Sequence, residues 1–139
     1  MITRASELFA RIACTAANPI ERISIDYRNA AKPVPIGQRR DGSECGLEGL
    51  SEATRDQLFL SLRVAAIERF CRENEPLPFI ADDLFMTSDE QRVLPLLHIL
   101  AELGRTTQVI AFTHHQHVVD IAKDLTTAGI FVHTMPKAA

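Results

Sequence analysis

The chain has 139 residues, of which 46% are hydrophobic and 24% are charged, as in an ordinary globular protein with a proper core. Its formal net charge of −3 excludes a global electrostatic attraction to nucleic acid. No apolar run approaches the roughly 18 residues of a membrane span, and the cysteines (Cys14, Cys45 and Cys71) lack metal-type spacing. We therefore expect a single domain over residues 1–139, soluble and cytoplasmic, with no membrane partner.

The N-terminal third predicts a helix and then a small antiparallel sheet. A modest apolar face indicates a helix over residues 3–17, within segment 1–18. The next segment, residues 19–48, alternates at period two and contains the hairpin signal Asp41-Gly42. We expect a β-meander without chemistry there, with strands at residues 20–27, 34–40 and 43–47.

From residue 49 onward the pattern predicts helices that alternate with buried strands. Ser51 is a natural N-cap for a helix with a broad apolar face. The short apolar run at residues 78–83 predicts a buried parallel strand, so Leu62 and Ile80 should both be deeply buried. A capping box at residues 88–91 predicts the start of the next helix, which Pro95 should kink or delay. The remaining elements are a strand at 108–113, a helix through 118–125 and a final strand at 130–134.

This order predicts a parallel sheet with right-handed crossovers, in which ligands bind at the carboxyl ends of the strands. Asp82 and Asp83 end one predicted strand and His114 follows another, so we expect the three to converge. Two adjacent carboxylates repel each other, and a magnesium ion carrying a phosphate ester would relieve the repulsion. A strand that ends in a solvated acidic turn is the alternative.

Four short motifs resemble parts of ABC-type ATPases. The segment Leu50-Ser51-Glu52-Ala53-Thr54 resembles the LSGGQ signature, and residues 79–83 resemble the Walker B strand. Ser88-Asp89 falls at the D-loop, and Thr113-His114 matches the switch histidine. Their order resembles the C-terminal half of an SMC-like ATPase head, closest in wording to YhaN-like, double-strand-break-repair-type AAA family ATPases. The resemblance implies an α/β, P-loop NTPase-like C-terminal half, with all four motifs inside residues 49–139.

The resemblance also implies ATP and Mg²⁺ as cofactors and a role for each matching residue. Asp82 would hold magnesium through water, and Asp83 would stand where a glutamate polarises the attacking water. His114 would contact the γ-phosphate, and Asp89 would couple two sites across a dimer. The start of the signature helix would grip a nucleotide held by an opposing head, through Ser51, Glu52 and Ala53.

Three departures limit these implied roles. Ala53 replaces the signature glycine, where a methyl group crowds the ligand or forbids a positive φ. Asp83 is one methylene shorter than glutamate. No G-x-x-x-x-G-K-[ST] motif occurs in the 139 residues, so the chain alone should neither bind nor hydrolyse ATP.

Three functional hypotheses remain open. In the first, a Walker A and coiled-coil lobe, on another chain or in a missing N-terminal region, completes an ATPase that meets DNA only indirectly. In the second, the chain is an inactive interaction module that forms a homodimer. In the third, His114, His115 and His117 bind a metal, although no fourth ligand is evident in the sequence.

Overall fold

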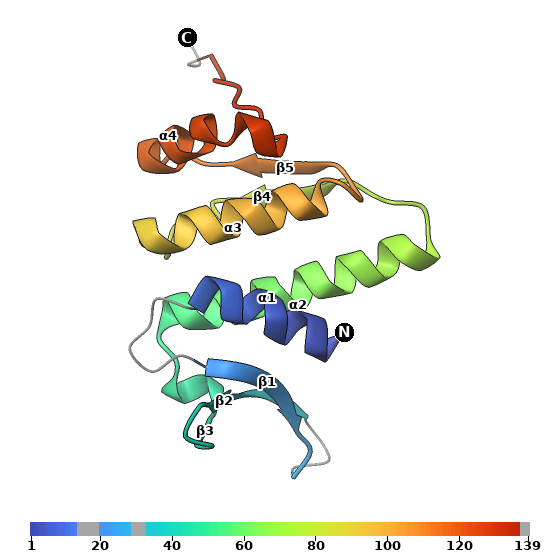
Figure 1. Cartoon of the computed structure of the whole chain (residues 1–139), viewed down its shortest axis with the longest axis vertical. Coiled ribbons are helices and arrows are strands. Elements are labelled where there is room, and N and C mark those ends of the chain that lie inside the picture. The colour runs from blue at the N-terminus through green and yellow to red at the C-terminus, as the bar shows by residue number, and fades with distance from the viewer. Residues whose placement is uncertain (14–19, 29–32, 137–139) are drawn as a thin grey trace. The chain divides into compact units, whose positions relative to one another are not determined.

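The computed structural model describes residues 1–13, 20–28 and 33–136. These residues form two compact units, residues 1–76 and residues 77–139 (Figure 1). The expectation of a single domain over the whole chain stays a prediction. None of the described helices is both long and apolar enough to cross a membrane.

The first unit begins with an amphipathic helix, α1 (Ile2–Ala13). Its apolar face packs on α2 (Glu52–Glu73) and on β1 (Ile20–Asp26). The predicted continuation to residue 17, with Cys14, falls outside the described residues. This face is closed to solvent. Ala5, Leu8 and Phe9 are 0% exposed, and Ile12 is 1% exposed.

The predicted β-meander is confirmed. β1 pairs antiparallel with β2 (Val34–Arg39), which pairs antiparallel with β3 (Glu44–Cys45). Gly42 lies in the connecting turn with φ +81°, a conformation that favours glycine. The third strand is shorter than expected because the chain turns into a 3₁₀ helix, η1 (Leu47–Gly49).

α2 begins as its sequence predicts. Ser51 is its N-cap, and the Ser51 hydroxyl accepts a hydrogen bond from the Thr54 N–H at 3.2 Å. Leu62 is only half-buried, so the prediction of deep burial there was wrong. The apolar face of α2 is broad, so only part of it is enclosed by packing. Leu58 and Val64 are fully buried, whereas Leu62 lies at the edge of the packed face.

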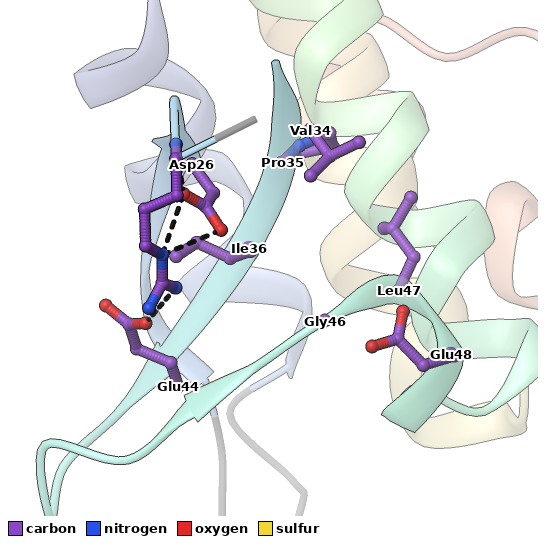
Figure 2. Close-up of a pocket in the computed structure, with 9 residues that line it drawn as sticks. Asp26, Val34, Pro35, Ile36, Glu44, Gly46, Leu47 and Glu48 are labelled. Atoms are coloured by element: carbon purple, nitrogen blue, oxygen red, sulfur yellow. Dashed lines mark hydrogen bonds and ion pairs between the residues drawn. The ribbon is translucent and has the colours of Figure 1, made fainter. Parts of the chain in front are cut away.

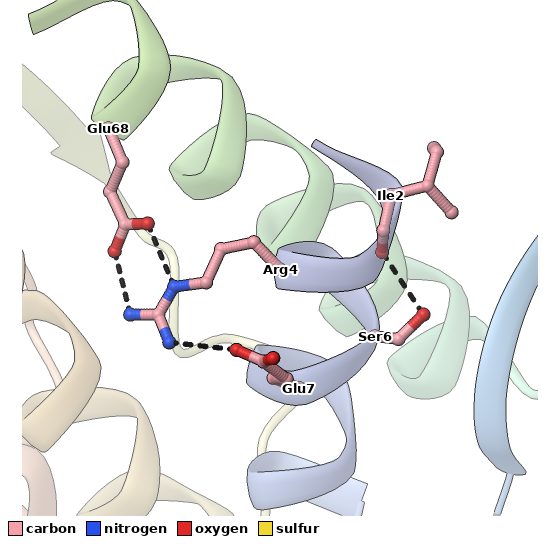
Figure 3. Close-up of polar contacts among 5 residues, drawn as sticks. All are labelled: Ile2, Arg4, Ser6, Glu7 and Glu68. Atoms are coloured by element: carbon pink, nitrogen blue, oxygen red, sulfur yellow. Dashed lines mark hydrogen bonds and ion pairs between the residues drawn. The ribbon is translucent and has the colours of Figure 1, made fainter. Parts of the chain in front are cut away.

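An ion pair and a buried hydroxyl tie α1 to its neighbours. Figure 3 shows the Arg4–Glu68 ion pair, and the contact of the Ser6 hydroxyl with Ile2 in the same helix. The Arg4 guanidinium donates to both carboxylate oxygens of Glu68 on α2, at 2.8 and 2.9 Å. These bonds raise the pKa of Arg4 above its usual value. The Ser6 hydroxyl accepts from the Ile23 N–H at 2.9 Å and lies 3.1 Å from the carbonyl oxygens of Ile23 and Ile2.

The second unit alternates strands and helices. β4 (Phe79–Asp82) and β5 (Val109–Phe112) pair in parallel, from Phe79 opposite Val109 to Asp82 opposite Phe112. Their connection contains α3 (Glu90–Leu103), and β5 is followed by α4 (Gln116–Asp124) and the 3₁₀ helix η2 (Thr126–Ala128). This mixed α/β arrangement agrees with the predicted fold class.

The expected final strand over residues 130–134 was wrong. The described residues 130–136 form no strand, and the parallel sheet described has two strands. Gly129 adopts φ +84° and ends the preceding 3₁₀ helix. An apolar run becomes a strand only where a neighbour offers backbone hydrogen bonds, and no described segment pairs with this run.

Burial in the parallel sheet also differs from expectation. Ile80 is 62% exposed and Phe112 is 42% exposed, whereas Ala81 is buried. Parallel strands are ordinarily covered on both faces, which is why the apolar run around Ile80 predicted deep burial. The prediction was wrong because one face of β4 has no cover among the described residues.

α3 carries most of the second unit's apolar core and tolerates two sequence irregularities. Its N-cap is Asp89, whose carboxylate accepts from the Arg92 N–H at 3.0 Å, one residue later than the predicted cap. Pro95 lies inside the helix, which runs without interruption from Glu90 to Leu103. Pro95 has no N–H, so the helix loses one hydrogen bond. Burial of the apolar face offsets this loss, and the buried residues are Val93, Leu96, Leu97, Ile99, Leu100 and Leu103.

Candidate functional site

β4 ends in a sharp change of backbone direction at Asp83. The Asp83 N–H still donates to the Phe112 carbonyl at 3.1 Å, continuing the β4–β5 ladder. Asp83 itself has φ +47°, and it is the one non-glycine residue with positive φ among the described residues. Such a conformation is uncommon outside glycine and costs roughly 1–2 kcal/mol. It turns the carboxylate out of the alternating strand pattern.

β5 ends in a turn that presents two imidazoles. Thr113 Oγ1 accepts from the His115 N–H at 3.2 Å, which fixes the turn into α4. His115 is the N-cap residue of α4, but its side chain makes no capping hydrogen bond. The rings of His114 and His115 are tilted by 33° with centroids 4.1 Å apart.

The predicted convergence of the acidic pair with His114 is confirmed for Asp83. His114 Nδ1 and Asp83 Oδ1 are 3.0 Å apart, with the two side chains 70% and 42% exposed. An ionised carboxylate only accepts, so the proton in this hydrogen bond belongs to Nδ1. Asp82 ends β4 beside this pair, and its exposed carboxylate makes no hydrogen bond or ion pair with the described part of the chain.

His115 extends the pair into a three-residue cluster. One ligand atom from each of Asp83, His114 and His115 lies within 4.8 Å of the other two. His115 Nε2 is buried without a hydrogen-bond partner in the described structure. The sequence hypothesis joined His114 and His115 to His117 and found no further ligand. It missed Asp83 because that residue is separated by 31 positions and enters from the other strand.

The signature-like residues belong to the first unit. Ser51 caps α2, and Glu52 and Ala53 lie in its first turn. Ala53 is therefore helical, and the concern that its methyl group forbids a required positive φ does not apply in this structure. Glu52 is favourably placed because a helix N-terminus carries partial positive charge. The D-loop candidate Asp89 is in the second unit, where it caps α3 and pairs with Arg92 at 3.3 Å.

A separate hollow of about 360 Å³ lies in the meander. Figure 2 shows Asp26 and Glu44 among the residues that line it. The Arg28 guanidinium bridges these two carboxylates, at 2.9 Å from Asp26 and 2.8 Å from Glu44. The Arg28 side chain and backbone N–H lower the pKa of Asp26. The charges in this bridge satisfy one another.

Sequence comparison relates part of the chain to one bacterial protein. The chain is 39% identical over 83 residues to the uncharacterized protein YhaN of Bacillus subtilis strain 168. The match covers 58% of this chain but only 8% of YhaN, so the chain spans a small part of that relative. No protein-family model matches the chain.

Structural comparison covers more of the chain. A structure from a study of ATP-driven dimerization and DNA-stimulated activation of SMC ATPases matches 87% of this chain and 71% of its own, at TM-score 0.65 and 17% identity. A second match is the Pyrococcus furiosus Smc head domain with an extended coiled coil, bound to the C-terminal domain of ScpA. It covers 86% of this chain and 29% of its own, at TM-score 0.62 and 17% identity. The SMC head domain of Thermotoga maritima matches 86% of this chain and 39% of its own, at TM-score 0.56 and 14% identity. The chain therefore has the mixed α/β, P-loop NTPase-like fold found in SMC ATPase head domains.

Proposed function

We propose that this chain acts as the C-terminal lobe of an SMC-like ATP-binding protein, carrying its signature and Walker B elements. The observation that carries the proposal is the 3.0 Å contact between His114 Nδ1 and Asp83 Oδ1. It lies at the carboxyl ends of two paired parallel strands, where open α/β sheets bind their ligands. Phosphoryl transfer depends mainly on positioning and charge neutralisation, which such side chains supply.

The donor set suits a hard cation beside a phosphate. The Asp82 carboxylate is exposed at the end of β4, and Mg²⁺ favours one or two carboxylates together with phosphate oxygens. Asp82 is the residue proposed to hold Mg²⁺ through water. When bound with ATP, the ion would neutralise charge on the phosphates.

Asp83 and His114 form the proposed catalytic pair. The carboxylate accepts a hydrogen bond from the Nδ1–H group and holds the imidazole in one orientation. In a neutral ring this leaves His114 Nε2 as an acceptor, on a side chain that is 70% exposed. His114 is proposed to orient a water or contact the γ-phosphate through Nε2. Because Asp83 is shorter than glutamate, it is proposed to act mainly by positioning His114.

The remaining site residues are proposed to act between two heads. Ser51, Glu52 and Ala53 begin α2, and free N–H groups at a helix start favour anions. They are proposed to meet the γ-phosphate of a nucleotide held by an opposing head. Asp89 is proposed to couple the two sites.

A second lobe is part of this proposal. The 139 residues contain no Gly-Lys-Ser/Thr phosphate loop, so the β-phosphate cradle would come from a Walker A lobe with its coiled coil. The exposed sheet positions Ile80 and Phe112 are consistent with such a cover. The similarity to SMC heads supports a role in DNA repair or chromosome maintenance, with DNA contacted through the assembly.

The test is reconstitution of ATP hydrolysis. The full chain is mixed with a purified Walker A lobe, including its coiled-coil stem, from an SMC-like head. We expect turnover in the mixture and none in either part alone. In the mixture, Asp82→Asn, Asp83→Asn and His114→Ala should each lower kcat by about 10²–10⁴, while the exposed controls Asp124→Asn and His98→Ala should not change it.

A second pair of variants separates capping from nucleotide contact. Ser51→Asp keeps an N-cap oxygen but places a negative charge where the phosphate is proposed to bind. It should preserve the stability of the chain and abolish turnover of the mixture. Hydrolysis by the chain alone, or a mixture in which Asp82→Asn is fully active, would contradict the proposal.

An inactive interaction module is the second candidate function, and the exposed apolar sheet favours it. Ile80 and Phe112 lie on the two paired strands, where they could contact another chain whether or not nucleotide is present. This reading predicts that the Walker A lobe, or a second copy, binds the chain tightly without any ATP turnover. Sedimentation and hydrolysis measured on the same mixture distinguish the two functions.

A further inference from the structure

We infer that Asp83, His114 and His115 form a binding site for a divalent transition metal ion, with zinc as the best-suited ion. Their ligand atoms lie within 4.8 Å of one another. The inference does not rest on the proposed ATPase role, because it concerns the chain without nucleotide or a second lobe.

The ligand types select the class of metal. Two imidazoles and one carboxylate are a set used by zinc enzymes, which keep a fourth position for water. Imidazole suits Zn²⁺, Ni²⁺ and Co²⁺, whereas Mg²⁺ and Ca²⁺ prefer oxygen ligands alone. The site therefore differs in chemistry from the all-oxygen magnesium position proposed at Asp82.

The geometry is close to what one ion requires. Bond lengths near 2.1 Å place two ligand atoms of a tetrahedral zinc about 3.4 Å apart, and His114 Nδ1 and Asp83 Oδ1 are already 3.0 Å apart. An ion would replace the proton that these two atoms share. The ligand atom of His115 already lies within 4.8 Å of the other two, and rotation of the side chains would have to close the remaining gap.

His115 supplies the independent observation. Its Nε2 is buried and has no hydrogen-bond partner among the described residues, and buried polar atoms are ordinarily paired. The ring does not cap α4, although His115 occupies the N-cap position. The His115 ring packs against the rings of His114 and His117, but this packing leaves Nε2 unpaired, whereas a metal ligand role would use a ring nitrogen.

Access and backbone support the same assignment. The side chains of His114 and Asp83 are 70% and 42% exposed, so an ion can enter from solvent. Asp83 holds φ +47°, which Asn also tolerates. Asp83→Asn therefore removes the charge with the backbone conformation kept.

The experiment is isothermal titration of the full chain with ZnCl₂, repeated with Co²⁺ while the visible absorption of bound cobalt is recorded. We expect one ion per chain and release of protons, detected as a buffer-dependent heat. Asp83→Asn, His114→Ala and His115→Ala should each weaken binding by at least about tenfold. MgCl₂ in excess should not displace the ion.

Two histidine variants serve as controls. His98→Ala removes an exposed histidine of α3, and His117→Ala removes a neighbour whose ring centroid is 5.6 Å from that of His115. Neither should weaken binding. Loss of binding in His117→Ala with normal binding in Asp83→Asn would overturn this ligand set. A wild-type chain that binds zinc no more tightly than the Asp83→Asn variant would overturn it as well. Circular dichroism checks folding, and the half-exposed Asp83→Asn change keeps the test decisive if His115→Ala does not fold.

Discussion

The two compact units treat their apolar residues in opposite ways. In the first, α1 is enclosed by α2 and β1, and Leu8 and Phe9 are completely buried. In the second, the parallel pair β4–β5 keeps Ile80 62% exposed, although parallel sheets are usually covered on both faces. The difference indicates that the first unit is closed by its own elements, whereas the sheet of the second leaves apolar side chains exposed.

The largest contrast should appear in stability. Phe9→Ala empties a fully buried position and should lower the free energy of unfolding by about 3–5 kcal/mol. Ile80→Ala changes an exposed position and should cost no more than about 0.5 kcal/mol. Urea unfolding followed by circular dichroism measures both, and equal losses would show that the two units do not differ as described.

Association should show the next largest effect. If the exposed face of β4 binds another copy, sedimentation of the wild-type chain should depend on concentration. Ile80→Lys should raise the apparent dissociation constant by at least about tenfold, because burial of one isoleucine contributes about 1.5–3 kcal/mol. Thr126→Lys, an exposed position of η2, is the matched control. A wild-type chain that stays monomeric at high concentration would argue against self-association.

The helix caps should contribute less, and to a similar degree in both units. Ser51→Ala removes the acceptor for the Thr54 N–H, and Asp89→Ala removes the acceptor for the Arg92 N–H. Each should lower stability by about 1 kcal/mol. Ser51→Asp should retain stability in the same thermal denaturation measurement. A loss in Ser51→Asp as large as in Ser51→Ala would show that Ser51 does more than cap.

The smallest expected effect is a pH dependence confined to the meander of the first unit. Hydrogen bonds from Arg28 lower the pKa of Asp26 in the folded chain. The contribution is therefore fully present above the unfolded-state pKa of about 3.9 and is lost as the pH falls through the lower folded value. The stability difference between wild type and Asp26→Asn should shrink over that acidic range. A difference that grows as the pH falls would have the wrong sign.

Sequence reasoning succeeded where the determinants are local. The Ser51 cap and the meander turn at Gly42 depend on neighbouring residues alone. The meeting of Asp83 with His114 followed from strand order, because both residues end parallel strands.

It failed where burial or pairing depends on distant segments. The same apolar run places Ala81 inside and Ile80 outside, and only the tertiary cover decides which positions are enclosed. Residues 130–134 have a strand-like pattern without a described strand to pair with. The metal hypothesis drawn from the three histidines likewise left out Asp83, which lies 31 positions from His114 and meets it only in the folded chain.

The Ser6 hydroxyl has a consequence for solubility. β1 is an edge strand of the meander, and the free backbone groups of an edge can template pairing with another chain. Ser6 contacts both the N–H and the carbonyl oxygen of Ile23, so one short side chain from α1 occupies the outward-facing pair in the middle of that edge. A Ser6→Ala chain would leave the buried Ile23 N–H unsatisfied, so we expect this change to make the edge a better template for strand addition.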